Sequence, residues 1–445
     1  MIRRTLLAAA AALAISAPAA AQDFAITNAT VATGDGSAPI ENATVVVRGG
    51  KIVAAGANVQ VPAGVPVSDG TGTWITPGIF ATVTALGLWD VGAVGESNDT
   101  TARSSPFGAA LDAAPAINPR SQHILVSRAG GITRAAVAPD AASSIFAGQG
   151  SMIDLGDDTD AVHRQRAFQF VELGETGGRI AGGSRTAAHT LLRNALREAA
   201  RFGEKSGLSG SEARDPRMTE SDAERGSDAL LTRFDAAALV PVVTGRQPLY
   251  VHAERAADIR AVLALPREFP RLELVLVGAS EGWLVADEIA AAGVPVIANA
   301  LNDLPAQFEQ LAATQSNIGR MQDAGVKVAI NASAMEQPRY LPHFAGNLVA
   351  LGSIAGAAGL SWGEALAAIT SVPAEISGYG GQLGVLAPGA AGDVVVWNGD
   401  PLEVSSNPVR VYIDGVEQPL DNHQTRLRDR YRDLDESDLP KAYDW

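Results

Sequence analysis

Short apolar runs separated by tight turns dominate both ends of the chain. The β-rich runs lie at residues 24–26, 43–47, 51–55, 393–397 and 409–413. Gly49-Gly50 separates the second run from the third, and a glycine pair between two apolar runs is typical of a hairpin turn. This pattern predicts β-strands in the N-terminal and C-terminal parts.

The middle of the chain instead alternates short strands with segments of helical apolar spacing. The clearest unit is a strand at 272–277, a helical pattern from Trp283 to Ala291 and a new strand at 293–297. A second unit pairs a strand around His252 with a helical pattern at 256–264. Alternation of this kind indicates parallel β/α units.

These two patterns of apolar positions predict two folded units. The first is a β domain built from both termini, from residues 22–75 and 383–420, around a β/α region at 76–382. The remaining segment, 421–445, alternates Arg with acidic residues and is typical of a solvated tail.

The first 21 residues have the pattern of a secretory signal peptide. Arg3 and Arg4 precede an apolar run at 6–15, and Ala19-Ala20-Ala21 provides small residues for cleavage. The apolar run is too short to span a bilayer. We therefore expect cleavage after Ala21, a periplasmic or secreted location, and no membrane attachment of the mature protein.

Composition and charge narrow the possible partners. The chain is 47% hydrophobic and has no cysteine, so disulfides and thiolate metal ligands are excluded. Removal of the leader would take two of the 34 basic residues and leave 32 against 49 acidic ones, a net charge of −17. Such a surface repels nucleic acid and anionic lipid, which leaves a small-molecule ligand or a protein as the partner.

Five motifs occur in an order that resembles the amidohydrolase superfamily, near its imidazolonepropionase-like and dipeptidase-like exported members. They are the segments at 76–80, 251–259, 383–393, 398–402 and 412–415. The resemblance extends from about residue 24 to 418. It implies a distorted (β/α)8 TIM-type barrel with a composite β-sandwich domain. It also implies one or two divalent metals at the carboxyl ends of the barrel strands, where they would activate water.

The metal ligands of the family are mostly replaced in this chain. The resemblance places Asp and then His-X-His on the first strand, where this sequence has Ala81, Val83 and Ala85. The sixth-strand histidine falls near Val277 or Gly278, neither of which can bind a metal through its side chain. The eighth-strand aspartate falls within 331–334, where no carboxylate occurs. A binuclear metal site is therefore not expected.

Two candidate metal ligands remain under the resemblance. His252 matches the fifth-strand histidine, and Glu175 falls where some relatives present a carboxylate. Together they could hold one weakly bound, zinc-like divalent metal, although stable zinc sites use three or four protein ligands. The alternative is that no metal binds, His252 is a core histidine hydrogen-bonded to a neighbour, and Glu175 is a solvated loop acid.

Other residues near the expected strand ends suggest further chemistry. Residues 278–282 match the Gly-X-Ser-X-Gly pattern of a nucleophile elbow, with Ser280 as the candidate nucleophile. The candidate substrate-binding residues beyond the fifth and sixth strands are Arg255, Asp258, Glu281 and Trp283.

Three functions follow from these observations. The resemblance implies a hydrolase of non-peptide or dipeptide-like carbon–nitrogen bonds, with activity reduced or lost because ligands are missing. The second possibility is a non-catalytic barrel that binds a small molecule, forms a homo-oligomer or pairs with an active relative. The third is a serine hydrolase that uses Ser280.

Overall fold

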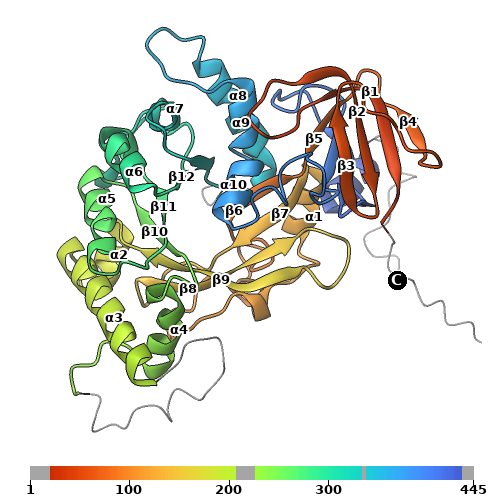
Figure 1. Cartoon of the computed structure of the whole chain (residues 1–445). Coiled ribbons are helices and arrows are strands. Elements are labelled where there is room, and N and C mark those ends of the chain that lie inside the picture. Colours follow the sequence, from red (N-terminus) through yellow and green to blue (C-terminus); the bar gives the residue numbers. More distant parts are fainter. Residues whose placement is uncertain (1–20, 207–225, 333–336, 433–445) are drawn as a thin grey trace, which may run out of the picture.

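The computed structural model describes residues 21–206, 226–332 and 337–432 (Figure 1). All but the last residue of the predicted leader lies outside the described residues, so export stays a prediction. Among the described residues, no helix is both long enough and apolar enough to cross a membrane.

Strands from both ends of the chain form one composite sheet. Its members are β1 (Phe24–Val31), β2 (Ile40–Arg48), β3 (Lys51–Gly56), β4 (Val67–Asp69), β5 (Trp74–Pro77), β14 (Val394–Trp397), β15 (Pro408–Ile413) and β16 (Val416–Glu417). The order is β16-β15-β14-β5-β1-β2-β3, with β4 also paired to β1. The two termini meet where β14 runs antiparallel to β5, with Val394 opposite Pro77. One unit thus contains β-rich runs from both ends, as the sequence predicts.

The second sheet is a nearly closed barrel. Its strands are β6 (Ile79–Thr84), β7 (Ile132–Val137), β8 (Phe146–Asp154), β9 (Val162–Glu172), β10 (Leu249–Ala253), β11 (Leu274–Gly278), β12 (Val296–Ala298) and β13 (Val328–Ile330). They pair in chain order, and a parallel bridge between Thr82 and Asn331 joins the two edges. β8 runs antiparallel to both of its neighbours, whereas the other pairs are parallel. The predicted barrel is therefore confirmed, with one reversed strand.

Most of the helices lie around the barrel, and the first of those given next also contacts β15 of the composite sheet (Figure 1). They are α1 (Gln122–Ala129), α2 (Glu175–Ile180), α3 (Arg185–Ser206), α4 (Arg233–Val243), α5 (Ala256–Leu263), α6 (Ala286–Ala292), α7 (Asn317–Asp323), α8 (Leu341–Leu351), α9 (Trp362–Ala367), α10 (Ser371–Ile376) and α11 (His423–Arg430). The helix expected from Trp283 begins instead as a 3₁₀ turn, Gly282–Val285, that leads into α6.

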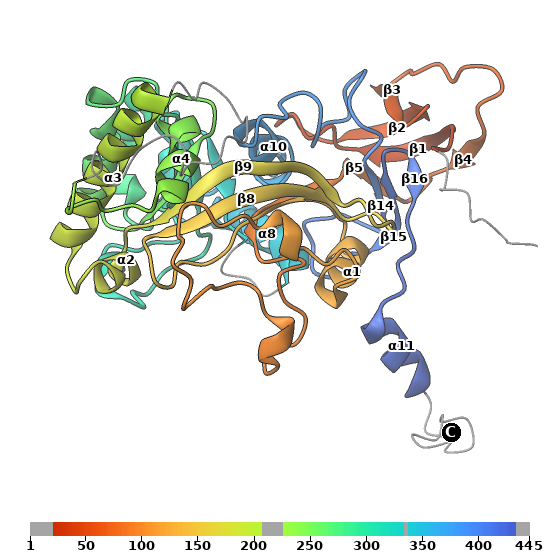
Figure 2. The ribbon, with the colours of Figure 1, turned by 90° about the horizontal axis from the view of Figure 1, so that it is seen from below.

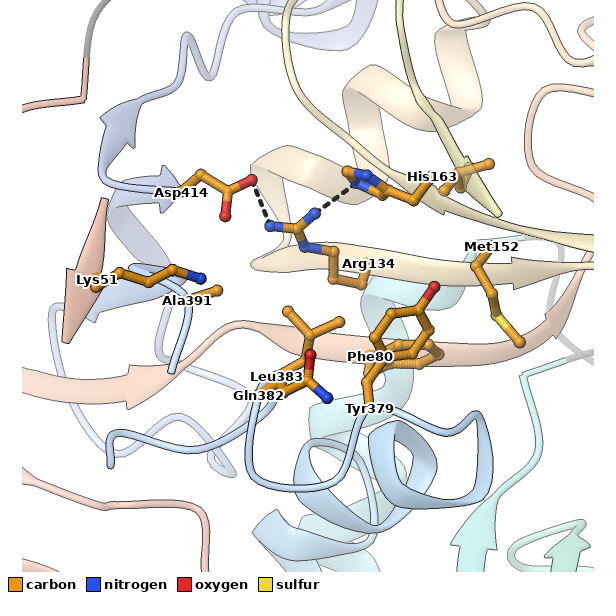
Figure 3. A pocket seen from close by; sticks show the side chains of 11 residues that line it. Lys51, Phe80, Arg134, Met152, His163, Tyr379, Gln382, Leu383, Ala391 and Asp414 are labelled. Atoms are coloured by element: carbon orange, nitrogen blue, oxygen red, sulfur yellow. Dashed lines mark hydrogen bonds and ion pairs between the residues drawn. The ribbon is translucent and has the colours of Figure 1, made fainter. Parts of the chain in front are cut away.

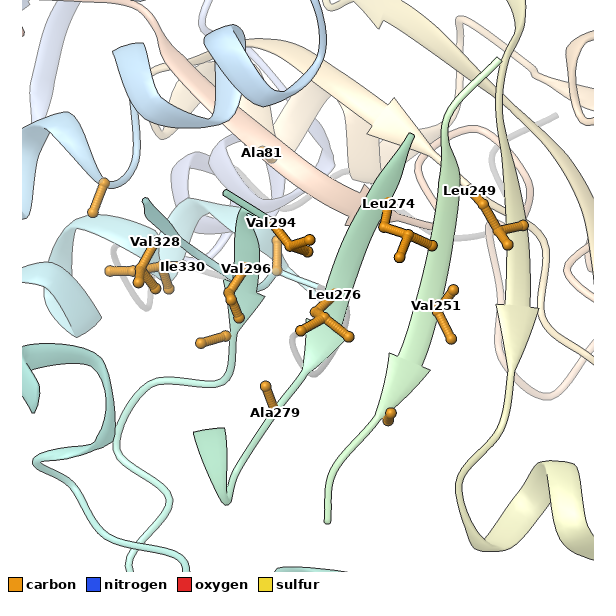
Figure 4. Close-up of a cluster of buried hydrophobic side chains, with 14 of the residues drawn as sticks. Ala81, Leu249, Val251, Leu274, Leu276, Ala279, Val294, Val296, Val328 and Ile330 are labelled. Carbon is orange, nitrogen blue, oxygen red and sulfur yellow. The ribbon is translucent and has the colours of Figure 1, made fainter. Parts of the chain in front are cut away.

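Alternation along the barrel strands builds two separate cores. Leu249 and Val251 face outward, toward the layer that contains the buried faces of α3, α5 and α6 (Figure 4). Tyr250 lies between them in sequence and points into the barrel, where it stacks on Phe168 with ring centroids 4.2 Å apart. The interior is therefore packed with side chains, as in other barrels of this class, and a ligand can enter only at the ends.

A buried arginine joins the barrel to the composite sheet. Arg134 on β7 donates from Nε and Nη2 to the two oxygens of Asp393, at 2.7 and 2.9 Å, and from Nη2 to Asp414 at 2.7 Å. The β8–β9 hairpin extends toward the same sheet (Figure 2), where the Asp157 amide donates to Gln418. These contacts hold the two units together at the amino ends of the parallel strands.

Candidate functional site

The carboxyl ends of the parallel strands bring polar residues together at the opposite end of the barrel. His252, near the end of β10, lies opposite Glu172 at the end of β9 and Val277 on β11. Strand pairing therefore places Glu172 and His252 side by side, although they are 80 positions apart in the sequence. This end of the barrel is called the mouth below.

Two carboxylates hold the His252 ring from both sides. Nδ1 lies 2.8 Å from Glu172 Oε1, and Nε2 lies 3.2 Å from Glu254 Oε1. Since a carboxylate only accepts hydrogen bonds, both ring nitrogens must carry protons, which makes the ring an imidazolium cation. Burial alone would lower the pKa of His252, but the two carboxylates outweigh it and raise this pKa well above its usual value. His252, Glu172 and Glu254 are called the ion triad below.

Glu254 is almost fully covered, and its charge is satisfied by several donors. Besides His252, it accepts from the Ser280 amide at 2.8 Å and from the side chains of Asn299 and Gln310 at 3.3 Å. Burial would raise the pKa of Glu254, but the contact with His252 outweighs it and the pKa is lowered. The triad is thus a charged network fixed within the fold.

Gly278 makes room for this carboxylate. A Cβ atom at this position would lie 2.7 Å from Glu254 Oε1, and the backbone has a φ of +88°. The residue that stands near the family's sixth-strand histidine therefore provides space for Glu254 and adopts a conformation that side chains rarely tolerate.

We expect Gly278→Ala to lower the free energy of unfolding by about 2 to 4 kcal/mol, because it adds a clash with Glu254 to the cost of a strained backbone. Gly293 is the matched control, since it also has positive φ (+63°) but no atom within 4 Å of an added Cβ. Gly293→Ala should cost about 1 kcal/mol. Urea unfolding of both variants measures the difference, and equal losses would show that Glu254 does not occupy this space.

The donors at the mouth do not fit a divalent metal. Val83 and Ala85 have no side-chain lone pair, and Asn331 donates its Nδ2 to Asn299 at 2.7 Å. Both nitrogens of His252 already face carboxylates, so neither offers a lone pair to a cation. Within the residues that the structure describes, no group of three or more His, Asp or Glu side chains could hold a metal ion.

The recorded contacts of Glu175 are with residues outside the ion triad. It begins α2, its amide donates to Glu309 Oε2 at 2.7 Å, and its carboxylate is 3.5 Å from Arg185. The carboxylate that contacts His252 belongs to Glu172, three residues earlier. Glu172 is not among the site residues predicted from the sequence, although its position as the last residue of β9 is a signal that could have identified it. A metal role for Glu175 stays a prediction.

The four predicted substrate-binding residues mainly fix the loops around the mouth. Arg255 donates to both oxygens of Asp258, at 3.1 and 3.0 Å. Glu281 accepts from the amides of Ala256 and Ala312, at 3.0 and 3.2 Å. Trp283 donates from its indole nitrogen to the Ala312 carbonyl at 2.8 Å. Glu281 and Trp283 thus hold the loop after β12 near the start of α5, and direct contact of any of the four with a ligand stays a prediction.

In the described part of the chain, Ser280 has the Glu254 carboxylate beside it but no histidine. Its amide donates to Glu254, and its Oγ accepts from the Asn302 side chain at 3.3 Å. A nucleophilic serine requires a general base within hydrogen-bond reach, and no histidine is among the recorded partners of Ser280. The serine-hydrolase hypothesis stays a prediction, which labelling by a fluorophosphonate probe, lost in Ser280→Ala, would test.

Comparison with known proteins gives two short sequence matches and several structural matches over most of the chain. Residues 353–417 match the Amidohydrolase family. The amidohydrolase tasK of Hapsidospora irregularis is 47% identical over 60 residues, which are 14% of this chain but only 6% of that protein. The chain therefore spans a small fraction of the length of this curated relative.

Solved structures resemble the chain over most of its length. An amidohydrolase from Thermotoga maritima MSB8 superposes with a TM-score of 0.76 at 24% identity, covering 88% of this chain and 99% of that one. Phenylurea hydrolase B superposes with a TM-score of 0.52 at 17% identity, covering 89% and 96% of the two chains. At these identities the likeness concerns the fold.

Proposed function

We propose that the chain is a member of the amidohydrolase superfamily and a ligand-binding barrel that works without a catalytic metal. The observation that carries the proposal is the ion triad. A protonated imidazole between two carboxylates supplies a fixed positive charge at the place where the resemblance puts a metal ligand. The triad offers no metal-activated water, so hydrolysis of a carbon–nitrogen bond is not the function that this geometry favours.

The carboxylate oxygens at the mouth favour a positively charged ligand. Glu172 uses Oε1 for both His252 and the Gly174 amide, and in the described residues its Oε2 has no recorded partner. Desolvation and the nearby Glu172 carboxylate raise the pKa of Asp140, which follows β7. Two neighbouring carboxylates with an open oxygen attract an ammonium group, which would donate to Glu172 while His252 holds that carboxylate in place.

Metal content separates this proposal from a metal-dependent hydrolase. We expect the mature protein, purified without chelator and then incubated with excess zinc, to hold well under one equivalent, because the imidazole nitrogens are occupied. Elemental analysis of wild type, His252→Ala and Glu175→Ala measures this. Near-stoichiometric metal that falls in both variants would contradict the proposal and support a mononuclear hydrolase.

Ligand charge provides a second test. We expect benzylamine, a cation at neutral pH, to bind more tightly than neutral benzyl alcohol, and Glu172→Gln to weaken benzylamine binding about tenfold because it removes the charged acceptor. Glu175→Gln is the matched control, since its carboxylate faces Arg185 instead, and should bind like wild type. Titration calorimetry measures all of these, and equal binding of amine and alcohol would refute the proposed ligand class. Association with an active relative or with a second copy stays a prediction.

A further inference from the structure

A cavity lies at the end of the barrel opposite the mouth, between the β8–β9 hairpin and the composite sheet (Figure 3). Its volume is about 320 Å³, which is within the range of small-molecule sites. Phe80, Arg134 and His163 line it from near the amino ends of β6, β7 and β9, and Lys51 lines it from β3. Segments from both units of the protein therefore enclose it, a position where ligand sites are common.

The Nη1 group of Arg134, at this cavity, lacks a hydrogen-bond acceptor among the described residues. Arg134 Nη1 lies 2.5 Å from His163 Nε2, but His163 Nε2 also lies 2.7 Å from Asp154 Oδ2. A neutral imidazole nitrogen either donates or accepts, so it can serve only one of these neighbours. The bond to the carboxylate is the charge-assisted one and is favoured. When Nε2 donates to Asp154, Nη1 of Arg134 needs another acceptor.

Lys51 presents a second cationic donor. Among the described residues, no hydrogen bond or ion pair is recorded for its amine, and the side chain extends into the cavity from β3 beside Ala391 (Figure 3). Asp414 also lines the cavity, but its Oδ2 already accepts from Arg134. Among the described residues that line the cavity, Lys51 is therefore a positive charge without a recorded partner, although the chain as a whole carries a net charge of −15.

The remaining wall is apolar. Phe80, Met152 and Leu383 contribute aromatic, thioether and aliphatic surface next to the cationic groups (Figure 3). Such a surface favours burial of a hydrocarbon body at about 25 cal/mol per Å². An inorganic anion would leave this surface unused.

We propose that this cavity binds a small organic carboxylate with an apolar body. The carboxylate accepts from the Lys51 amine and from Nη1 of Arg134, and the body packs on Phe80, Met152 and Leu383. The site is separate from the mouth and does not depend on the ion triad.

Calorimetric titration with phenylacetate tests this assignment. We expect phenylacetate to bind at least tenfold more tightly than neutral phenylacetamide, and Lys51→Gln to reduce phenylacetate affinity about tenfold. Lys327→Gln is the matched control, because Lys327 is similarly exposed but pairs with Glu375, and it should bind like wild type. Glu172→Gln at the mouth should also leave this binding unchanged.

Three results would overturn the assignment. They are no measurable binding of phenylacetate, equal binding of phenylacetate and phenylacetamide, and unchanged affinity in Lys51→Gln. An unaltered melting temperature of unliganded Lys51→Gln would show that the variant is folded, so that reduced affinity reports the lost amine.

Discussion

Replacing His252 with alanine should lower the free energy of unfolding at pH 7 by about 3 to 5 kcal/mol, because it removes the only cation that, among the described residues, is recorded within hydrogen-bond distance of Glu254. The side chain of Glu254 is 2% exposed, so water cannot replace the lost partner. Urea unfolding followed by circular dichroism measures the loss. A loss below about 1 kcal/mol would show that the triad is not a charged unit.

His189→Ala is the control for the His252 prediction. His189 contacts Asp258 at 3.2 Å, but Arg185 and Arg255 also pair with this carboxylate. Asp258 therefore keeps a cationic partner when the imidazole is removed. We expect a loss of under about 1 kcal/mol.

The His252 contribution should also depend on pH. Because the folded-state pKa is raised above the unfolded value of about 6.5, the stabilisation is fully present below that pH. It is then lost as the pH rises through the folded-state pKa. The stability difference between wild type and His252→Ala should therefore narrow on the alkaline side, and a difference independent of pH would argue against an imidazolium.

Replacing Arg134 with methionine should have an effect of similar size, about 3 to 5 kcal/mol, because it leaves the Asp393 carboxylate buried without its cation. Arg134 and Asp393 have side chains that are 5% and 2% exposed. Burial would raise the pKa of Asp393, yet the arginine outweighs it and lowers this pKa. Thermal and urea unfolding measure the loss.

Arg260→Met is the matched control for this variant. Arg260 also pairs through Nε and Nη2 with a carboxylate, that of Glu288, but both side chains are about half exposed. We expect Arg260→Met to cost far less stability than Arg134→Met, because solvent screens this exposed pair. The double variant Arg134→Met with Asp393→Asn should be more stable than Arg134→Met alone, since it removes the unpaired charge. Further destabilisation would mean that the charge of Asp393 was not the cause.

The sequence predicted the fold better than the site, for identifiable reasons. Turn motifs such as Thr76-Pro77-Gly78 are local, so their order could indicate the barrel and the return to the composite sheet. The triad is not local, because Glu172 and His252 are 80 positions apart and meet only through strand pairing. From the sequence, Gly278 indicates only a missing metal ligand. In the structure, the absence of a side chain at Gly278 leaves the space that the Glu254 carboxylate occupies.

The reversed strand β8 shows the same limit. Its residues are buried along the whole strand, as are those of β7. Such a run has no direction in sequence, and the direction is set by the short connections on either side. Neither the strand at Phe146–Asp154 nor its orientation was among the predictions made from the sequence.

The composite sheet has a consequence for the order in which the protein folds. β14 lies between β5 and β15, and Trp397 on β14 donates to Thr76 on β5, 321 positions earlier. During synthesis, one edge of β5 therefore stays unpaired until nearly the whole chain has been made. Contacts so distant in sequence slow folding, and an open edge invites pairing with other chains. A nascent or truncated chain that ends before β14 should thus depend on chaperones to stay soluble, and the last strands made complete the first domain begun.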